Sequence, residues 1–222
     1  MLIPALNLIF IHSMKTGGSS ISDALIARFP TSGEKVRTRE YQDMEHLFEI
    51  RDTLGFSKHA ALHRYSSALG ATRFSEIDVV TVYRNPVYRL LSAHFCPSVR
   101  KSEDVKFSAY GLYKLVRRRS SLFRYLKSHG DEASPKSIRV MNFACLDLAA
   151  NNIGDEFPGF PTDLPRLNPS KRPGYERNWL FLAIAFLMVV TSHHVWDFFL
   201  SPGRSATKKF GRIRLRLLGY RT

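Results

Sequence analysis

The chain has 222 residues, of which 44% are hydrophobic and 23% charged, a globular balance that excludes a disordered or fibrous chain. Lys and Arg number 33 against 19 for Asp and Glu, so the formal net charge is +14. This surplus favours anionic partners such as nucleotides, acidic glycans, nucleic acid or membrane headgroups. Since domains usually run to about 100–200 residues, the length predicts one domain over residues 1–222.

The first elements are two strands, each followed by a turn and a helix. Residues 8–11 are an unbroken apolar run, typical of a strand buried on both faces. From Ser19 the apolar spacing becomes helical, and residues 30–33 end that helix. Residues 77–83 predict a second strand, and Pro86 begins the next helix. This order predicts an α/β fold with a central parallel sheet flanked by helices.

The middle of the chain gives less regular patterns. Residues 44–54 are predicted to be helical, and residues 56–62 to form a short strand that carries His59. Residues 107–129 predict one or two basic amphipathic helices. Residues 151–173 are rich in Gly, Pro, Asn and Asp, so we expect a long irregular segment there.

The last part of the chain, residues 174–222, is apolar and then basic. The apolar run over residues 179–190 is shorter than the roughly 20 residues that cross a bilayer, so it predicts a buried helix or an interfacial segment. Peripheral membrane contact through residues 179–200 is therefore one expectation. Residues 201–222 are expected to be a solvated basic tail.

Cysteine usage and the N-terminus bear on the compartment. The two cysteines form neither a CxxC pair nor a zinc-binding spacing, which favours a reducing compartment and predicts no metal site. Residues 1–11 are apolar without a basic region before them, so a buried first strand explains them better than a signal peptide. A cytoplasmic location, with membrane association as a further option, is expected.

A candidate anion site lies between the first strand and its helix. A cation, two glycines and three hydroxyl residues follow one another there: Lys15, Thr16, Gly17, Gly18, Ser19 and Ser20. The glycines let backbone N–H groups approach an oxyanion, and the helix N-terminus adds about half a positive charge. A P-loop NTPase or kinase has its lysine after the glycines, whereas Lys15 precedes them. The alternative is a simple Gly/Ser turn with a hydroxyl cap.

A second candidate anion site follows the second strand. Arg84 stands at the strand end, and Ser92 lies one or two turns into the next helix. Ligands of open α/β sheets bind at such strand ends. A guanidinium suits a phosphate monoester, to which a serine adds a hydroxyl donor. The alternative is an arginine that pairs with a surface carboxylate.

Together these two segments resemble the nucleotide-binding elements of the PAPS-dependent sulfotransferases (PAPS is 3′-phosphoadenosine 5′-phosphosulfate), in the branch of carbohydrate and bacterial enzymes. The first segment is similar to the family's PKTGxxS loop, which grips the 5′-phosphosulfate, with Met14 in place of proline. The second is similar to the family's RxPxxRxxS segment, which grips the 3′-phosphate: Arg84, Pro86, Arg89 and Ser92 match its pattern, and the resemblance implies Arg84 and Ser92 as ligands. Residues 164–171 resemble a late loop that closes over the nucleotide, which implies Ser170 and Lys171 as further ligands.

The resemblance implies a P-loop-like three-layer fold and transfer of a sulfuryl group from PAPS to an acceptor hydroxyl, by resemblance that of a saccharide, without a metal. Lys15 would stabilise the leaving oxygen. His59 is the first candidate for the general base and His63 the second, with Glu45 or Glu49 as alternatives.

Residues 174–222 have no counterpart in the family, so the C-terminal third is divergent. The alternative function is that of a non-catalytic basic protein that binds nucleotides or anionic polymers, since residues 110–125 interleave Lys and Arg with Tyr and Phe. That feature is diffuse, and no specific nucleic acid partner is expected.

Overall fold

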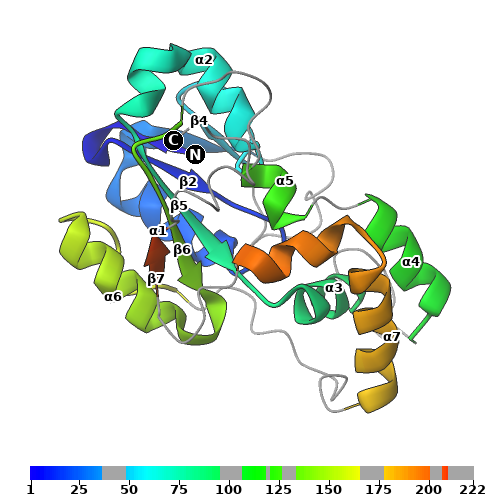
Figure 1. The fold of residues 1–222 in the computed structure, drawn as a ribbon. Helices are drawn as coiled ribbons and strands as arrows, with labels where there is room; N and C mark the ends of the chain where they lie inside the picture. The colour runs from blue at the N-terminus through cyan, green and yellow to red at the C-terminus, as the bar shows by residue number, and fades with distance from the viewer. Residues whose placement is uncertain are drawn as a thin grey trace.

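The computed structural model of the protein describes residues 1–36, 49–95, 107–118, 121–126, 134–165, 178–200 and 207–209. A five-stranded sheet lies at its centre, in the order β1-β2-β5-β6-β7 (Figure 1). Its strands are β1 (Leu2–Ile3), β2 (Leu8–Ile11), β5 (Asp78–Tyr83), β6 (Ser137–Asn142) and β7 (Thr207–Lys209). A smaller antiparallel sheet pairs β3 (Gly33–Val36) with β4 (Glu49–Asp52).

The central sheet is mixed. β2, β5 and β6 run parallel to one another, whereas β1 and β7 pair antiparallel at the two edges. The predicted α/β class and the parallel centre of the sheet are thus confirmed, while the antiparallel edge strands make the sheet mixed. β1 reaches β2 through the 3-10 turn η1 (Pro4–Leu6). So short a connection joins only antiparallel strands, since a parallel pair needs a crossover of a dozen or more residues.

Helices cover both faces of the sheet. One face carries α1 (Gly18–Arg28) and α6 (Leu146–Glu156), and the other carries α2 (Leu62–Ser75) and α5 (Leu122–Leu126). Along β2, Leu8 and Phe10 belong to the core under α1, while Ile9 and Ile11 belong to the core under α2. All four side chains are fully buried, because successive strand residues point to opposite faces and both are covered. This confirms the first predicted strand and helix.

A third cluster of helices extends beyond the sheet. It consists of α3 (Pro86–His94), α4 (Ala109–Arg118) and α7 (Trp179–Val190), and Figure 1 shows it past the ends of the central strands. The 3-10 segment η7 (His193–Leu200) follows α7 and brings Leu200 into the core under α2. One or two helices are expected in residues 107–129, and the described residues form two, α4 and α5.

Several sequence expectations fail where tertiary contacts outweigh local pattern. The helix expected over residues 44–54 is wrong from Glu49 onward, where β4 begins. The carboxylate of Asp52 explains the extended backbone, because it accepts N–H bonds from Leu2, Leu54 and Phe56 and a bond from the Tyr65 hydroxyl. The strand expected over residues 56–62 is reduced to an isolated bridge between Arg51 and Ser57.

The C-terminal half also departs from expectation at two places. Helix α6 continues to Glu156, so the irregular segment expected from residue 151 begins later. β7 lies inside the stretch expected to be a solvated tail, where residues 207–209 pair with residues 139–141 of β6. This pairing satisfies backbone groups that an exposed strand edge would leave to solvent. Residues 201–206 and 210–222 lie outside the described residues.

In the described parts of the chain, every helix is too short or too polar to traverse a bilayer.

Candidate anion-binding site

The candidate site lies where the parallel strands end together. Ile11 of β2 is opposite Thr81 of β5, and Tyr83 of β5 is opposite Asn142 of β6. Because parallel strands put their carboxyl ends at one edge, the segments that follow them must meet there. Residues 12–17, which we call the Lys15 loop, follow β2. Arg84 follows β5 and Phe143 follows β6.

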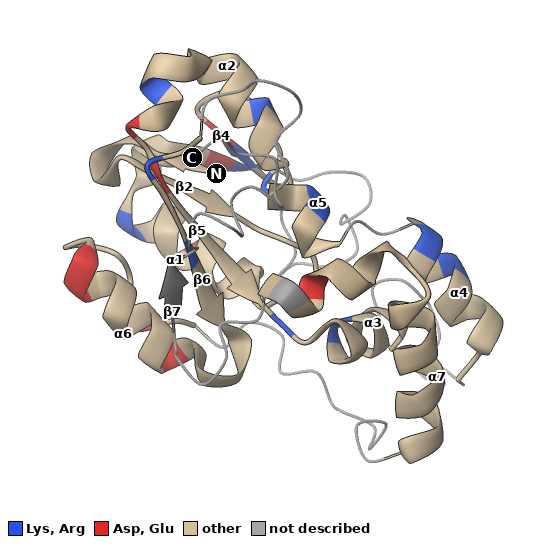
Figure 2. Cartoon of the chain, in the orientation of Figure 1, with Lys and Arg blue, Asp and Glu red and all other residues tan. Residues whose placement is uncertain are grey.

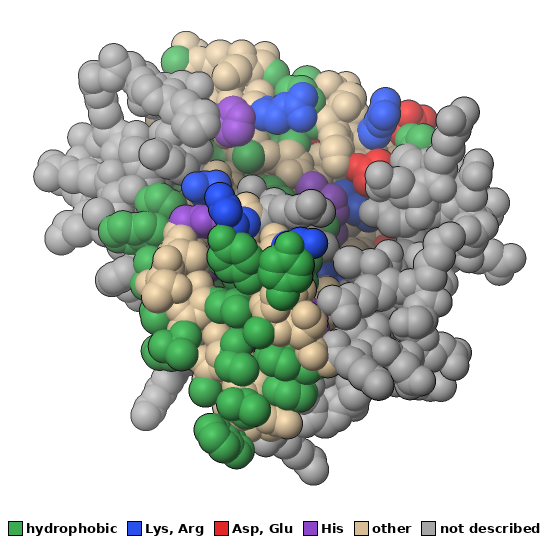
Figure 3. Space-filling model, turned by 90° about the vertical axis from the view of Figure 1, so that its right-hand side faces the viewer, with side chains coloured by type: hydrophobic (Ala, Val, Ile, Leu, Met, Phe, Trp, Pro, Cys, Tyr) green, Lys and Arg blue, Asp and Glu red, His purple; other side chains and the backbone are tan. Residues whose placement is uncertain are grey.

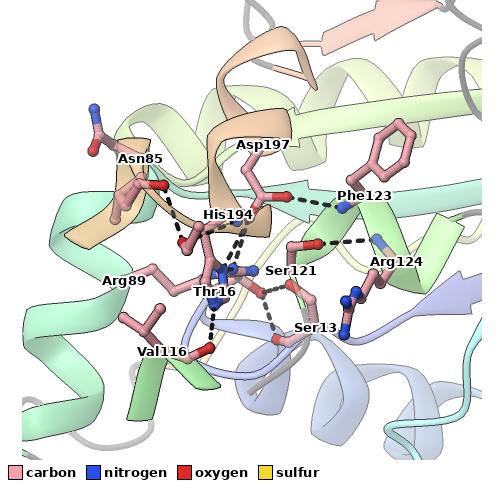
Figure 4. A network of polar contacts seen from close by, with 12 residues as sticks. Ser13, Thr16, Asn85, Arg89, Val116, Ser121, Phe123, Arg124, His194 and Asp197 are labelled. Carbon is pink, nitrogen blue, oxygen red and sulfur yellow. Dashed lines mark hydrogen bonds and ion pairs between the residues drawn. The ribbon is translucent and has the colours of Figure 1, made fainter. Parts of the chain in front are cut away.

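The loop after β2 is held in shape by its own hydroxyl groups. The fully buried Thr16 donates its hydroxyl hydrogen to the Ser13 carbonyl oxygen at 2.8 Å, and Ser13 Oγ lies 3.3 Å from Thr16 Oγ1, as Figure 4 shows. Lys15 and Gly17 both have positive φ, at 65° and 79°. Thr16, expected to bind phosphate through its hydroxyl, is therefore placed to stabilise the loop.

The two glycines of the loop have neighbours that exclude a side chain. A Cβ on Gly17 would lie 2.7 Å from the ring of Phe143, and a Cβ on Gly18 would lie 2.2 Å from the ring of His12. Gly17 caps α1 without a side-chain hydrogen bond. No side-chain oxygen of the N-cap residue therefore offsets the partial positive charge at the start of α1. Ser19 is half-buried and Ser20 buried in the first turn.

Arg84 joins the two predicted anion-binding segments. Its Nη1 donates to the carbonyl oxygen of Lys15 at 3.3 Å and to Ser92 Oγ at 3.2 Å. Its guanidinium carbon lies 4.5 Å from the ring centroid of Phe143, a cation–π distance. The structure thus brings together Lys15, Arg84 and Ser92, and Phe143 lies under the guanidinium as a flat support.

His59 lies beside the residue that opens the loop. Its Nδ1 is 3.1 Å from the carbonyl oxygen of His12, and the two rings have centroids 4.5 Å apart. Since a carbonyl oxygen can only accept, Nδ1 carries the hydrogen, and in the neutral ring Nε2 is the basic atom. Burial, and then the charges of His59 and Lys58, hold the pKa of His12 well below its ordinary value of 6.5, so the buried ring is neutral.

The turn that carries His59 is supported by a carboxylate. Ser57 Oγ donates to the Glu49 carboxylate, and the His59 N–H bonds to Ser57 Oγ at 3.3 Å. Glu49, expected as an alternative base, is thus placed to brace this turn. Burial lowers the pKa of Lys58, against the raising effect of the Glu49 and Asp23 carboxylates. His63 is half-buried in α2, and Glu45, Ser170 and Lys171 lie outside the described residues.

Arg89, the second arginine of the motif, forms a buried ion pair with Asp197. Its Nη2 lies 2.6 Å from Asp197 Oδ2 and 2.9 Å from His194 Nδ1, as Figure 4 shows. Asp197 also accepts the N–H of Phe123 at 2.8 Å, and His194 Nε2 lies 3.2 Å from the carbonyl oxygen of Val116. This cluster ties η7 to α3, α4 and α5.

The Asp197 carboxylate is charged at neutral pH. Burial alone raises the pKa of Asp197, but the Arg89 guanidinium and the backbone N–H of Phe123 outweigh it and hold the pKa below its ordinary value. The cluster borders a small pocket beside the loop, lined by Met14, Lys15, Pro86, Arg89, Leu90, Ala93 and His194.

Four residues at this edge had no role in the sequence analysis: His12, Phe143, His194 and Asp197. His12 gave the only local signal, since an ionisable residue directly follows an apolar strand. Phe143 follows a strand that the sequence analysis does not predict, and the two C-terminal residues act on α3 across more than 100 positions.

Comparison of the chain with protein-family models, with curated proteins and with solved structures gives no match. Among the described residues, no three His, Cys, Asp or Glu side chains group so that they could hold a metal ion. The function has to be inferred from the side chains and backbone groups at this edge.

Proposed function

We propose that this protein is a sulfotransferase that moves a sulfuryl group from PAPS to an acceptor hydroxyl. Saccharides are the first acceptors to test. The observation that carries the proposal is the position of Arg84, whose guanidinium contacts both Ser92 Oγ and the Lys15 carbonyl. Two anion-binding elements from separate strand ends therefore adjoin. A ligand with phosphate groups at two positions, such as an adenosine 3′,5′-bisphosphate, suits such a pair.

The segments that follow β2 and β5 would each bind one end of the donor PAPS. The backbone N–H groups around Gly17 and Gly18, with the Lys15 ammonium, suit the 5′-phosphosulfate. The Arg84 guanidinium and the Ser92 hydroxyl suit the 3′-phosphate, since a guanidinium offers several donors in one plane. A P-loop-like arrangement of the sheet, with the nucleotide at the carboxyl ends of β2 and β5, belongs to this proposal.

The chemistry asks the protein for charge stabilisation and one proton acceptor. PAPS supplies the sulfuryl group in activated form. His59 Nε2 would take the proton of the acceptor hydroxyl as that oxygen bonds to sulfur, with Nδ1 held by the His12 carbonyl. The Lys15 ammonium would stabilise the negative charge on the bridging oxygen as its bond to sulfur breaks and it keeps the electron pair. Neutral His12 places no second positive charge beside His59.

The test is ligand-dependent thermal stability. PAP, the desulfated product, at about 100 times its Kd should stabilise the protein by about 2.7 kcal/mol and raise Tm by roughly 5–10 °C. Adenosine 5′-phosphate lacks the 3′-phosphate and should raise Tm less than PAP does. ATP and single-stranded DNA should also raise Tm less than PAP does. Equal shifts with adenosine 5′-phosphate would remove the role of Arg84 and Ser92. A larger shift with DNA would replace the enzyme by a polymer-binding protein.

A further inference from the structure

Helix α7 presents an apolar face to solvent, which we call the α7 face. It consists of Trp179, Leu180, Phe186 and Leu187, whose side chains are 76%, 47%, 50% and 60% exposed. They form two adjacent pairs, Trp179 with Leu180 and Phe186 with Leu187, seven residues or about two turns apart, so they lie along one side of the helix. The twelve residues of α7 include no charged or polar side chain. Apolar patches of this kind on a protein surface mark interaction sites.

The opposite side of α7 is fixed in the core. Ala185 and Val189 are fully buried and pack in one cluster with α3 and α4. Phe181 stacks on Phe107 with ring centroids 4.0 Å apart. The helix is therefore anchored by one side, and the α7 face does not stabilise the cluster beneath it.

Helix α4 packs against α7 and adds aromatic and basic side chains, which we call the α4 edge. Tyr110 and Tyr113 are 65% and 45% exposed. Lys114 Nζ lies 4.3 Å from the Tyr110 ring centroid, and Arg117 Nη1 donates to the Tyr113 hydroxyl at 3.0 Å. Figure 3 shows apolar side chains gathered over this side of the molecule, with Lys and Arg beside them.

The charged side chains that α4 brings to this surface are all basic, and α7 carries none. Neither α4 nor α7 contains Asp or Glu, and Figure 2 shows Lys and Arg on α4 while acidic residues stand on α6. Tryptophan and tyrosine prefer the boundary between water and lipid, and Lys and Arg reach from it toward anionic headgroups. With a net charge of +14, this surface is complementary to an anionic bilayer.

From these observations we infer that the α7 face and the α4 edge dock on the surface of a bilayer that contains anionic phospholipid, with α7 lying in the interface. A protein partner with an apolar groove would explain the α7 face but not the cations of the α4 edge. Nucleic acid would explain the cations but not four exposed apolar side chains. The bilayer surface matches both.

Docking would also place the candidate anion-binding site relative to the membrane. η7 follows α7 directly and is held to α3 through the Arg89–Asp197 ion pair. α3 carries Ser92 and starts next to Arg84. The docking inference stands without the proposed function, because it uses neither the Lys15 loop nor Arg84.

The intrinsic fluorescence of the protein provides a direct test. The chain has two tryptophans, Trp179 on the α7 face and Trp196 on η7, where it packs on Phe123 with ring centroids 5.8 Å apart. The variant Trp196→Phe leaves Trp179 as a single reporter. With vesicles of 70% phosphatidylcholine and 30% phosphatidylglycerol, we expect its emission to shift to the blue and to be quenched by brominated acyl chains. Unchanged emission and no quenching would overturn the inference.

A matched pair of variants tests the apolar face. Leu187→Glu should lower vesicle affinity by about tenfold or more, because burial of one leucine side chain is worth about that factor. Leu148→Glu is the control, since Leu148 is 56% exposed on α6, a helix that lies on the opposite side of the sheet ends from α7 in Figure 1. An equal loss in both variants would show that the effect is not located on α7, and would overturn the inference.

A second pair tests the charges. The double variant Lys114→Gln with Arg117→Gln should lose about 25-fold in affinity at low salt, at about fivefold for each charge. Arg28→Gln with Arg73→Gln removes two exposed charges elsewhere and should lose much less. Tight binding to pure phosphatidylcholine would remove the anionic requirement. A dimer that Leu187→Glu dissociates, without vesicle binding, would assign the α7 face to a second copy of the chain.

Discussion

The carboxyl edge of the sheet and the α7 region depart in opposite ways from the usual rule that apolar side chains are buried and polar ones exposed. At the sheet edge polar groups are buried, among them His12 and Thr16. On α7 large apolar groups are exposed, up to 76% at Trp179. Buried polar groups and exposed apolar patches are the informative exceptions to the burial rule. Each region therefore carries features that the packed core does not explain, and the Arg89–Asp197 pair connects them.

The largest effect should come from breaking that connection. Asp197→Asn removes one charge of a pair whose side chains are 7% and 1% exposed. We expect the free energy of unfolding to fall by about 3–5 kcal/mol, because a buried guanidinium is left uncompensated. Unfolding in urea measures this change in the free energy of unfolding. The control is Asp23→Asn, which breaks the half-exposed pair with Lys35 and should cost about 1 kcal/mol or less. Equal costs would contradict a structural role for Arg89.

The same pair predicts an acid limb of stability. The pKa of Asp197 is lower in the folded protein than its ordinary value, so the folded state binds the proton less readily than the unfolded chain. The stabilisation is therefore complete above the ordinary pKa of about 4 and is lost as pH falls through the folded pKa. Unfolding free energies measured from pH 7 downward should show a smaller decline in Asp197→Asn than in the unchanged chain.

The next effect concerns catalysis at the sheet edge. Lys15→Ala should lower kcat for sulfuryl transfer from PAPS by about 10²–10³-fold, since one charge-stabilising donor at the reacting oxygen is worth that much. Transfer of labelled sulfate to a panel of glycans measures it. Lys35→Ala, on β3, removes a lysine outside the loop and should retain kcat. Full activity of Lys15→Ala would end the assignment.

A smaller effect is expected on nucleotide affinity. Arg84→Lys keeps the charge but loses the planar fork that reaches Ser92 and Lys15, so PAP affinity should fall by about tenfold or more. Arg64→Lys is the matched control, because Arg64 also lies over a ring, at 4.7 Å from the centroid of Phe56. Calorimetric titration with PAP separates the two. An unchanged Kd in Arg84→Lys would place the 3′-phosphate elsewhere.

The smallest effect separates backbone strain from steric contact. Gly17 and Gly55 have nearly the same φ, 79° and 73°, but only Gly17 has a neighbour, Phe143, where a Cβ would stand. Gly55→Ala should cost about 1 kcal/mol of unfolding free energy for the left-handed backbone alone. Gly17→Ala should cost at least about 1 kcal/mol more, because Phe143 must move, and it alone should reduce the Tm shift with PAP. Equal costs would contradict the contact.

Local sequence patterns determined the elements that begin the fold. The run of Leu8–Ile11 and the valines of β5 marked central strands, because a strand covered on both faces is apolar at every position. Glycines and prolines marked the turns that end them. The two candidate anion-binding segments can be predicted for the same reason: each is a short stretch in which spacing along the chain fixes spacing in the structure.

Only the tertiary structure decided the remaining features. β4 is a strand because Asp52 accepts N–H bonds from Leu2, 50 positions away, and from the turn of Leu54 and Phe56, and no local period records the distant contact. Arg89 matches the second arginine of the motif in sequence, but its partner Asp197 is 108 positions away. Phe143 could support Arg84 only after β6 had paired with β5. Contacts of this range leave no periodic trace in a sequence, since they depend on which surfaces remain to be covered once the sheet has formed.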